Sequence, residues 1–154
     1  MSAKTQALRE PIGHLDLLSP VVVDEQTPYA EMLSLMRRQA RGSVVICRGQ
    51  AVTGVFTERD YLYKHILEKV DPKTPIASLM SPHPVTVSSK TSLGDAVELM
   101  HEKRFRNLPI VDDKGSPVGL LTVGGIIRYL AQKFPREVVN LPPTMQVSDE
   151  TDGA

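Results

Sequence analysis

The chain is poor in the residues that several large classes of protein require. Among its 154 residues there is one cysteine, Cys47, and no tryptophan, with three phenylalanines and four tyrosines. A single thiol excludes a disulfide within the chain and any metal site built from several cysteines. So few aromatic rings leave little material for a platform on which nucleic-acid bases could stack.

Net charge is also lacking. Eighteen lysines and arginines balance eighteen aspartates and glutamates, so the formal charge at pH 7 is zero. Nucleic-acid binding needs clustered positive charge, and this balance argues against nucleic acid as the main partner. The chain has no apolar run of about 18 residues that would suit a membrane helix, and "MSAKTQALREPIGH" at its start lacks the apolar centre of a signal peptide. We therefore expect a cytoplasmic protein with no membrane association.

The motifs of common catalytic sites are missing as well. Neither G-x-x-x-x-G-K-[ST] nor G-x-G-x-x-G occurs, so no phosphate loop of the kinase or dinucleotide-binding type is indicated. The four histidines have no spacing typical of metal ligands; they are His14, His65, His83 and His101. We expect a protein that is not an enzyme, binds no metal and requires no cofactor.

What the chain does contain is an internal repeat. "SPVVVDEQT" (19–27) aligns with "HPVTVSSKT" (83–91) at an offset of 64 residues, which becomes 65 after a one-residue insertion. At that offset Gly54 aligns with Gly119, and Thr57 aligns with Thr122. Two copies, rather than the many of a solenoid, predict two halves related by a pseudo-twofold axis.

The first helix of each copy is predicted from apolar spacing. In copy one, Thr27 and Pro28 are typical of an N-cap followed by proline at the first helical position. The apolar residues after them recur at i, i+3, i+4 and i+7, as on one face of an amphipathic helix. They are Tyr29, Met32, Leu33 and Met36, matched in copy two by Leu93, Ala96, Val97 and Met100.

Two short apolar runs follow each of these helices and predict a β-hairpin, because turn residues such as "DDKGS" (112–116) separate them. A second helix is expected after each threonine, with Leu62 and Ile66 matching Ile127 and Ala131. Each copy therefore has the order β-α-β-β-α. Neither half buries enough surface alone, so we expect an α/β (α+β) fold with the halves packed sheet against sheet. The apolar runs are 44–47 and 51–56 in copy one, and 108–111 and 117–121 in copy two.

The repeat also predicts how the chain is divided. Residues 1–11 form an N-terminal extension, 12–70 the first motif, 71–75 a linker, 76–133 the second motif, and 134–154 a C-terminal tail. The prolines and late acidic residues of the tail predict that it is partly disordered.

Two phrases in register resemble those of a known family. With "GVFTERDYL" (54–62) and "KRFRNLPIVDD" (103–113), residues 12–133 are similar to a pair of cystathionine-β-synthase (CBS) motifs, often called a Bateman module. The resemblance implies two clefts between halves related by a pseudo-twofold axis, and homodimers formed through helices. It also implies that the clefts bind adenosine compounds such as AMP, ADP, ATP, NADH or S-adenosylmethionine. Copy one departs from the family where it reads "RGSVVICRG" (41–49) in place of an apolar-Pro-apolar strand.

The stretch "GVFTERD" (54–60) has two interpretations. Thr57 followed three residues later by Asp60 has the spacing of a helix capping box. Within the CBS family, the aspartate instead holds the ribose hydroxyls and the threonine lies against the ribose-phosphate, beside a helix N-terminus that suits phosphate. Copy two keeps Thr122 but has Gly125 where the aspartate would stand. We therefore predict one competent cleft rather than two.

The residues of that cleft can be mapped by position from the family pattern. The natural phosphate partners among them are Arg59 and Arg106. The nucleotide-binding set is Val55, Thr57, Arg59, Asp60, Ser81, Pro84, Val85, Thr86, Phe105 and Arg106. The second cleft, which we expect to be degenerate, takes Pro20, Val21, Val22, Asn107, Leu120 and Thr122.

The resemblance implies a regulatory module that binds an AMP- or ADP-like nucleotide in one cleft. The signal would pass through helix packing or dimer geometry to a protein partner that the sequence does not identify. The alternative is a structural dimerisation or interaction module that binds no nucleotide. The intact "GVFTERD" favours the first, whereas the missing second aspartate favours the alternative. Gly42 and Ser43 also favour it, because they stand where relatives that bind phosphate often have His or Arg.

Overall fold

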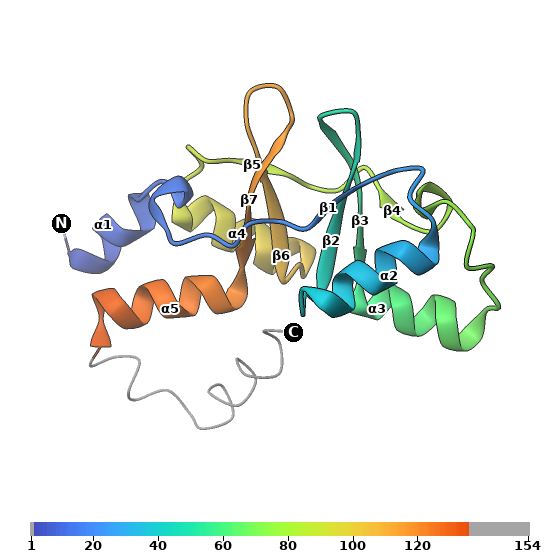
Figure 1. Cartoon of the computed structure of the whole chain (residues 1–154). Coiled ribbons are helices and arrows are strands. Elements are labelled where there is room, and N and C mark those ends of the chain that lie inside the picture. The colour runs from blue at the N-terminus through green and yellow to red at the C-terminus, as the bar shows by residue number, and fades with distance from the viewer. Residues whose placement is uncertain (1, 136–154) are drawn as a thin grey trace.

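The computed structural model describes residues 2–135, which form two similar halves side by side (Figure 1). The first half contains β1 (Val22–Asp24), α2 (Tyr29–Arg38), β2 (Ser43–Arg48), β3 (Ala51–Thr57) and α3 (Glu58–Leu62). The second half contains β5 (Val87–Ser88), α4 (Leu93–Lys103), β6 (Asn107–Val111), β7 (Pro117–Thr122) and α5 (Val123–Lys133). The predicted order of strand, helix, strand, strand and helix is thus confirmed in both halves.

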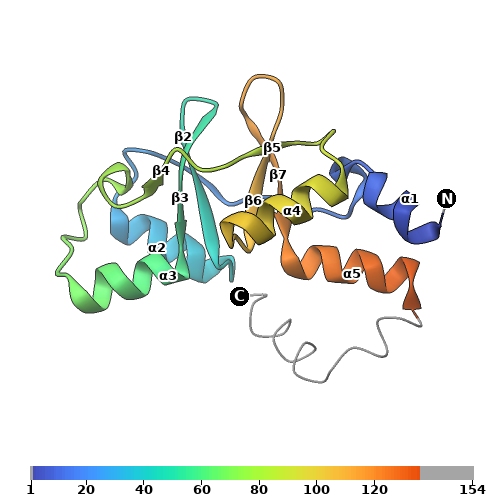
Figure 2. The ribbon, with the colours of Figure 1, turned by 180° about the vertical axis from the view of Figure 1, so that it is seen from behind.

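Additional elements precede β1 in the first half and β5 in the second. α1 (Ala3–Arg9) and the 3-10 turn η1 (Ile12–His14) come before the first, and the 3-10 turn η3 (Ile76–Ser78) and β4 (Ser81–Pro82) before the second. Figure 2 shows from behind that α2 and α3 lie beside the first sheet, and α4 and α5 beside the second. No helix within residues 2–135 has the length and apolar character needed to cross a bilayer.

The two copies exchange short segments between their sheets. The first sheet has the order β1-β2-β3-β4 and the second β5-β6-β7, with a parallel pair followed by an antiparallel hairpin in each. β4 belongs to the second copy by sequence, yet it pairs with β3, where Val55 lies opposite Ser81. In return, Leu18 of the first copy forms a bridge with Leu120 of β7. Each sheet is therefore completed by a segment from the other copy.

The aligned glycines of the repeat stand at these crossings. A Cβ atom at Gly54 would collide with the side chain of Met80, and one at Gly119 would lie 3.1 Å from Leu17 Cδ1. A missing side chain lets the crossing segment approach the strand closely. The repeated glycine therefore has a packing reason that does not involve a ligand.

Each half has its own hydrophobic core, and a third buried layer lies between the sheets. In β2, Val44 and Ile46 belong to the core under α2. Val45 and Cys47 alternate with them and point to the opposite face of the strand, yet they are only 1% and 3% exposed. Leu120, which alternates with the core residue Leu121, is likewise buried on the second sheet. The burial of both outward faces means that the sheets pack against each other, which confirms the expected fold class.

The tips of the two hairpins are also joined. Both hairpins project on the same side of the molecule (Figures 1 and 2), and the Val52 N–H donates a hydrogen bond to the Gly115 carbonyl at 3.1 Å. Gly115 has φ of +81° and Gly49 has φ of +60°, a backbone conformation that glycine adopts without steric cost. Glycine in each turn therefore follows from the shape of the hairpin.

The start of the first helix corrects one prediction. The N-cap of α2 is Pro28, no side chain among residues 2–135 caps the helix, and Thr27 lies outside it. The Tyr29 N–H instead donates to the Thr74 carbonyl at 2.8 Å. The linker thus supplies a backbone acceptor for a free N–H of the helix. The prediction of an N-cap at Thr27 was wrong, because a backbone carbonyl from a distant segment, and not the Thr27 side chain, accepts from the start of the helix.

The second helix of copy one differs from its counterpart in copy two. α3 is followed by a π-helical turn, η2 (Tyr63–Leu67), whereas α5 is a regular helix of 11 residues. Leu62 and Ile66 are 53% and 69% exposed, whereas the residues matched to them in α5 are half-buried. We call the exposed apolar surface of this helix the α3 face. It consists of Leu62, Tyr63, Ile66 and Leu67.

Candidate functional site

Thr57 and Asp60 form a complete capping box at the start of α3. The Thr57 N–H and hydroxyl both donate to Asp60 Oδ2, at 2.9 and 3.1 Å, and the Asp60 N–H donates to Thr57 Oγ1 at 3.3 Å. The capping interpretation is therefore confirmed. The carboxylate is half-buried, and its other oxygen, Oδ1, makes no hydrogen bond with residues 2–135. The box holds the carboxylate in place and leaves one of its oxygens to accept from another group.

The equivalent position in copy two has only half of this arrangement. Thr122 Oγ1 accepts from the Gly125 N–H at 2.9 Å, so the threonine caps α5 as Thr57 caps α3. Gly125 has no carboxylate to return the interaction. A Cβ atom there would lie 3.1 Å from Thr122 Oγ1, which is a tight contact. The backbone at the two caps is similar, with φ and ψ of −122° and 167° at Thr57 and of −120° and 155° at Thr122. The missing acid thus reflects the residue at position 125 rather than a different backbone.

The segment after β4 runs beside β3, the strand that ends at the capping box of Thr57 and Asp60. Val55 faces Ser81 across the β3–β4 pair, so two residues predicted from different copies are brought together. His83 follows with φ of +52°, and its N–H donates to the Thr53 carbonyl at 3.1 Å. Val85 then packs against the core of the second half. A left-handed histidine is uncommon, and such conformations concentrate at functional sites.

The two arginines predicted to bind phosphate lie in different places. The Arg59 guanidinium is 5.9 Å from the centroid of the Tyr63 ring, on its own helix. The Arg106 carbonyl accepts from the Val123 N–H at 3.1 Å, and the next residue, Asn107, lies opposite Thr122. The backbone of Arg106 therefore adjoins the residues predicted for the second cleft, just as Gly42 adjoins the box of copy one through the Glu58 N–H.

The remaining predicted residues are partly structural. Phe105 is 39% exposed and follows Arg104, whose φ is +57° at the end of α4. Val21 and Leu120, predicted for the second cleft, are 6% and 7% exposed, so their side chains mainly serve packing. Val22 is 43% exposed and remains accessible. Two of the six residues predicted for the second cleft are thus buried, and the position that matches Asp60 is Gly125.

One ion pair involves no residue predicted for either cleft and was not predicted from the sequence. Arg48 Nε donates to Glu25 Oε2 at 3.0 Å, and the Glu25 side chain is 9% exposed. The hydrogen bond from Arg48 is the main cause that lowers the pKa of Glu25 from its usual value. Because the two residues are 23 positions apart, only the β1–β2 pairing brings them together, and no local pattern marks them.

The fold gives Cys47 a packing role and forms no cluster of metal-ligating side chains within residues 2–135. Cys47 is buried between the sheets, and this burial raises the pKa of its thiol, which keeps it protonated. Within residues 2–135, histidine, cysteine, aspartate and glutamate nowhere gather in a group of three that could hold a metal ion.

Two β-α-β-β-α motifs packed by their sheets, with exchanged strands, define a paired-repeat module. The model of the CBS domain matches residues 14–65 and 76–132, one match in each half. The chain belongs to the CBS-domain family and contains one CBS pair.

Similar proteins agree with this assignment. CBS domain-containing protein CBSX3, mitochondrial, of Arabidopsis thaliana is 30% identical over 127 residues, which cover 79% of this chain and 61% of that protein. The solved structure of Arabidopsis thaliana CBSX2 in complex with AMP has a TM-score of 0.67 at 27% identity, covering 79% of this chain and 96% of that one. The cytosolic domain of the Mg²⁺ channel MgtE in complex with ATP has a TM-score of 0.64 at 26% identity, covering 84% and 55%. The chain spans less than two thirds of the length of its sequence relatives.

Proposed function

We propose that this CBS pair is a regulatory module that binds an AMP- or ADP-like nucleotide in the cleft at Thr57 and Asp60. The observation that carries the proposal is the half-used carboxylate: Asp60 Oδ2 is fixed by two hydrogen bonds from Thr57, and Oδ1 makes none within the described chain. A ribose hydroxyl is the group that such a fixed acceptor suits. Two solved structures of similar chains contain AMP and ATP.

Each of the other site residues has a proposed role. Val55 and Ser81, paired across β3 and β4, form one wall of the cleft, and Pro84, Val85 and Thr86 continue it. Phe105 supplies an accessible ring for the base. Arg59, at the box, is the first phosphate partner, and Arg106 is a second one from the edge of the other cleft.

The regulatory step requires two states of the protein. A nucleotide shifts an equilibrium only if it binds one state more tightly than the other. α3 begins at Asp60's own box and continues into the exposed α3 face. We propose that nucleotide binding changes the packing of this helix, and so the surface that a protein partner contacts.

We also propose that the α3 face is covered by a second copy of the chain, making a homodimer. Its four apolar side chains are 53%, 53%, 69% and 72% exposed, a cluster that soluble monomers rarely leave open. Light scattering should give the mass of a dimer for the wild type and of a monomer for Ile66→Glu. Val118→Glu, at a residue 53% exposed on a hairpin, is the matched control and should remain dimeric. A monomeric wild type would contradict the proposal.

The nucleotide proposal is tested by calorimetric titration with AMP, ADP, ATP, NADH and S-adenosylmethionine. Asp95→Ala is the matched control for Asp60→Ala, because both acids occupy the third position of a helix capped by a hydroxyl. We expect saturable binding of AMP or ADP in the wild type and in Asp95→Ala, and its loss in Asp60→Ala. Unchanged binding in Asp60→Ala would contradict the assigned site.

A second function remains supported by one observation. The hydrogen bonds of the box already give Thr57 and Asp60 a purely structural role. A dimeric interaction module that binds no nucleotide is the corresponding alternative. If none of the five compounds binds while the protein is still a dimer, this alternative is favoured.

A further inference from the structure

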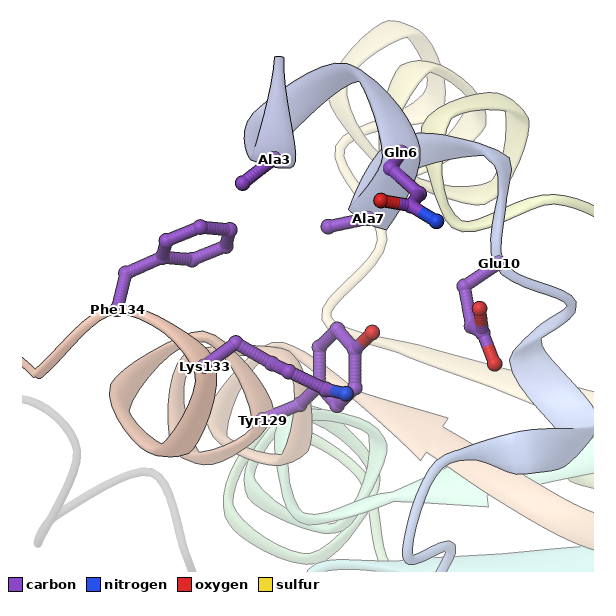
Figure 3. A pocket seen from close by; sticks show the side chains of 7 residues that line it. All are labelled: Ala3, Gln6, Ala7, Glu10, Tyr129, Lys133 and Phe134. Atoms are coloured by element: carbon purple, nitrogen blue, oxygen red, sulfur yellow. The ribbon is translucent and has the colours of Figure 1, made fainter. Parts of the chain in front are cut away.

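A hollow separate from both clefts lies between α1 and the end of α5 (Figure 3). Its polar lining consists of Gln6, Glu10, Tyr129 and Lys133. α1 and the C-terminal edge of the hollow fall outside the ranges 14–65 and 76–132 that match the CBS domain. The hollow is therefore built largely by segments that this chain adds to its pair of motifs.

The α1 wall of the hollow is firmly attached to the second half. The Leu93 N–H donates to the Glu10 carbonyl at 2.8 Å, and Ala7 is 8% exposed. A Cβ atom at Gly94 would lie 3.2 Å from the Leu8 carbonyl oxygen, so α1 approaches the start of α4 closely. The lining groups are thus held by backbone contacts rather than by a loose terminus.

An acid, Glu10, and a base, Lys133, line this hollow without pairing with each other. Lys133 Nζ lies 5.8 Å from the centroid of the Tyr129 ring, and no ion pair within 4.0 Å joins it to Glu10. Glu10 Oε1 bonds to His14 Nδ1 at 2.7 Å, which leaves Oε2 to accept from another donor. Burial and the Glu10 charge raise the pKa of Tyr129, so its hydroxyl is a donor at neutral pH.

The apolar part of the hollow lies at its other end. Figure 3 shows Phe134, Ala3 and Ala7 gathered on one side, and Glu10, Gln6 and the Tyr129 hydroxyl on the other. The volume is ≈ 260 Å³, below the roughly 300–1,000 Å³ of pockets for drug-sized ligands. A fitting ligand is therefore small, carries opposite charges, and has an apolar end.

From this geometry we propose that the hollow binds a free amino acid with an apolar side chain. Its carboxylate meets Lys133 and its ammonium meets Glu10, each through a charge-assisted hydrogen bond. Its side chain lies against Phe134 and Ala7. The site is independent of the nucleotide cleft, because it shares no residue with it.

The test is an NMR titration of the full chain with L-leucine, observing Tyr129 and Phe134. We expect saturable shifts, and affinities at least about tenfold weaker in Lys133→Met and in Glu10→Gln, the scale of a lost hydrogen bond to a charged group. Lys69→Met, at an exposed lysine of the first half, and Asp60→Ala should bind as the wild type does. Thermal melts of each variant show whether the fold is retained.

Ligand analogues separate the parts of the proposal. Glycine lacks the side chain, 4-methylpentanoate lacks the ammonium, and 3-methylbutylamine lacks the carboxylate, so each should bind at least about tenfold more weakly than leucine. The proposal is overturned if leucine produces no saturable shift up to its solubility limit. It is equally overturned if Lys133→Met binds leucine unchanged, or if either charge-deleted analogue matches leucine.

Discussion

The two halves of the molecule begin their second helix with different residues. Copy two caps its 11-residue α5 with Thr122 alone, whereas copy one has the full box of Thr57 and Asp60 before the five-residue α3. The fold therefore does not need the aspartate to start this helix. This comparison favours a role for Asp60 beyond capping.

The cores of the halves also differ at equivalent positions. Tyr29 and Phe56 form an edge-to-face pair with ring centroids 5.9 Å apart, where the second half has Leu93 and Leu121. Phe56 is 0% exposed. We expect Phe56→Ala to lower the free energy of unfolding by about 3–5 kcal/mol and Leu121→Ala by about 2–5 kcal/mol, measured by urea denaturation. Val118→Ala, at an exposed site, is the control, and a loss below about 1 kcal/mol for Phe56→Ala would show that the first half tolerates the cavity.

The Tyr29 hydroxyl extends this comparison, because it is buried with no hydrogen-bond partner among residues 2–135, whereas the Leu93 side chain has no polar atom to bury. A buried polar group without a partner costs about 1–3 kcal/mol. Tyr29→Phe removes the hydroxyl and keeps the ring, so we expect the free energy of unfolding to rise by about 1 kcal/mol. A loss of stability would instead mean that the hydroxyl is bonded in solution.

An aspartate at position 125 should make the start of α5 resemble the start of α3. Gly125→Asp completes the box with Thr122 and should raise the free energy of unfolding by about 0.5–1 kcal/mol in urea denaturation. Gly125→Ala is the control, because it removes the flexibility of glycine without adding a carboxylate. An aspartate variant no more stable than the alanine variant would mean that the carboxylate does not complete the box. If both variants are less stable than the wild type, the 3.1 Å contact between a Cβ atom at position 125 and Thr122 Oγ1 is too tight for any side chain.

The Glu25–Arg48 pair occurs in the first half, and its effect should be the smallest. Because the pKa of Glu25 is lowered in the folded protein from 4.5, the pair stabilises above about that pH, and the gain is lost as the pH falls through the lowered pKa. Arg48→Met should therefore reduce stability at pH 7 and flatten its decline in acid. Urea denaturation at a series of pH values measures both effects, and an unchanged acid limb would mean that another group lowers the pKa.

The order of elements and the capping box could be predicted, because apolar spacing and the Thr-x-x-Asp pattern depend on residues within one turn or strand. The repeat could be predicted because the two copies align in sequence. The exchange of β4 and the backbone cap of α2 by Thr74 do not, since both depend on segments distant in the sequence. Thr27 was wrongly predicted as the N-cap of α2 because no local pattern reveals that the distant Thr74 carbonyl accepts from this helix.

The candidate site was predictable only in part. Val55 and Ser81 were assigned to one cleft and lie opposite each other, because the repeat itself specifies which strand ends meet. The α3 face was not foreseen, because the same apolar spacing describes a buried helix and an exposed one. The backbone of Arg106 adjoins the residues predicted for the second cleft through Val123, a contact between a loop and a helix start that no spacing reveals.

The central claim, a single competent cleft at Asp60, is tested most directly by the stoichiometry of AMP binding in calorimetry. The wild type should bind one AMP per chain and Asp60→Ala none, while Asp60→Ala combined with Gly125→Asp reports whether the carboxylate alone transfers the site. Two AMP molecules per wild-type chain, or one per chain of Asp60→Ala, would contradict the account.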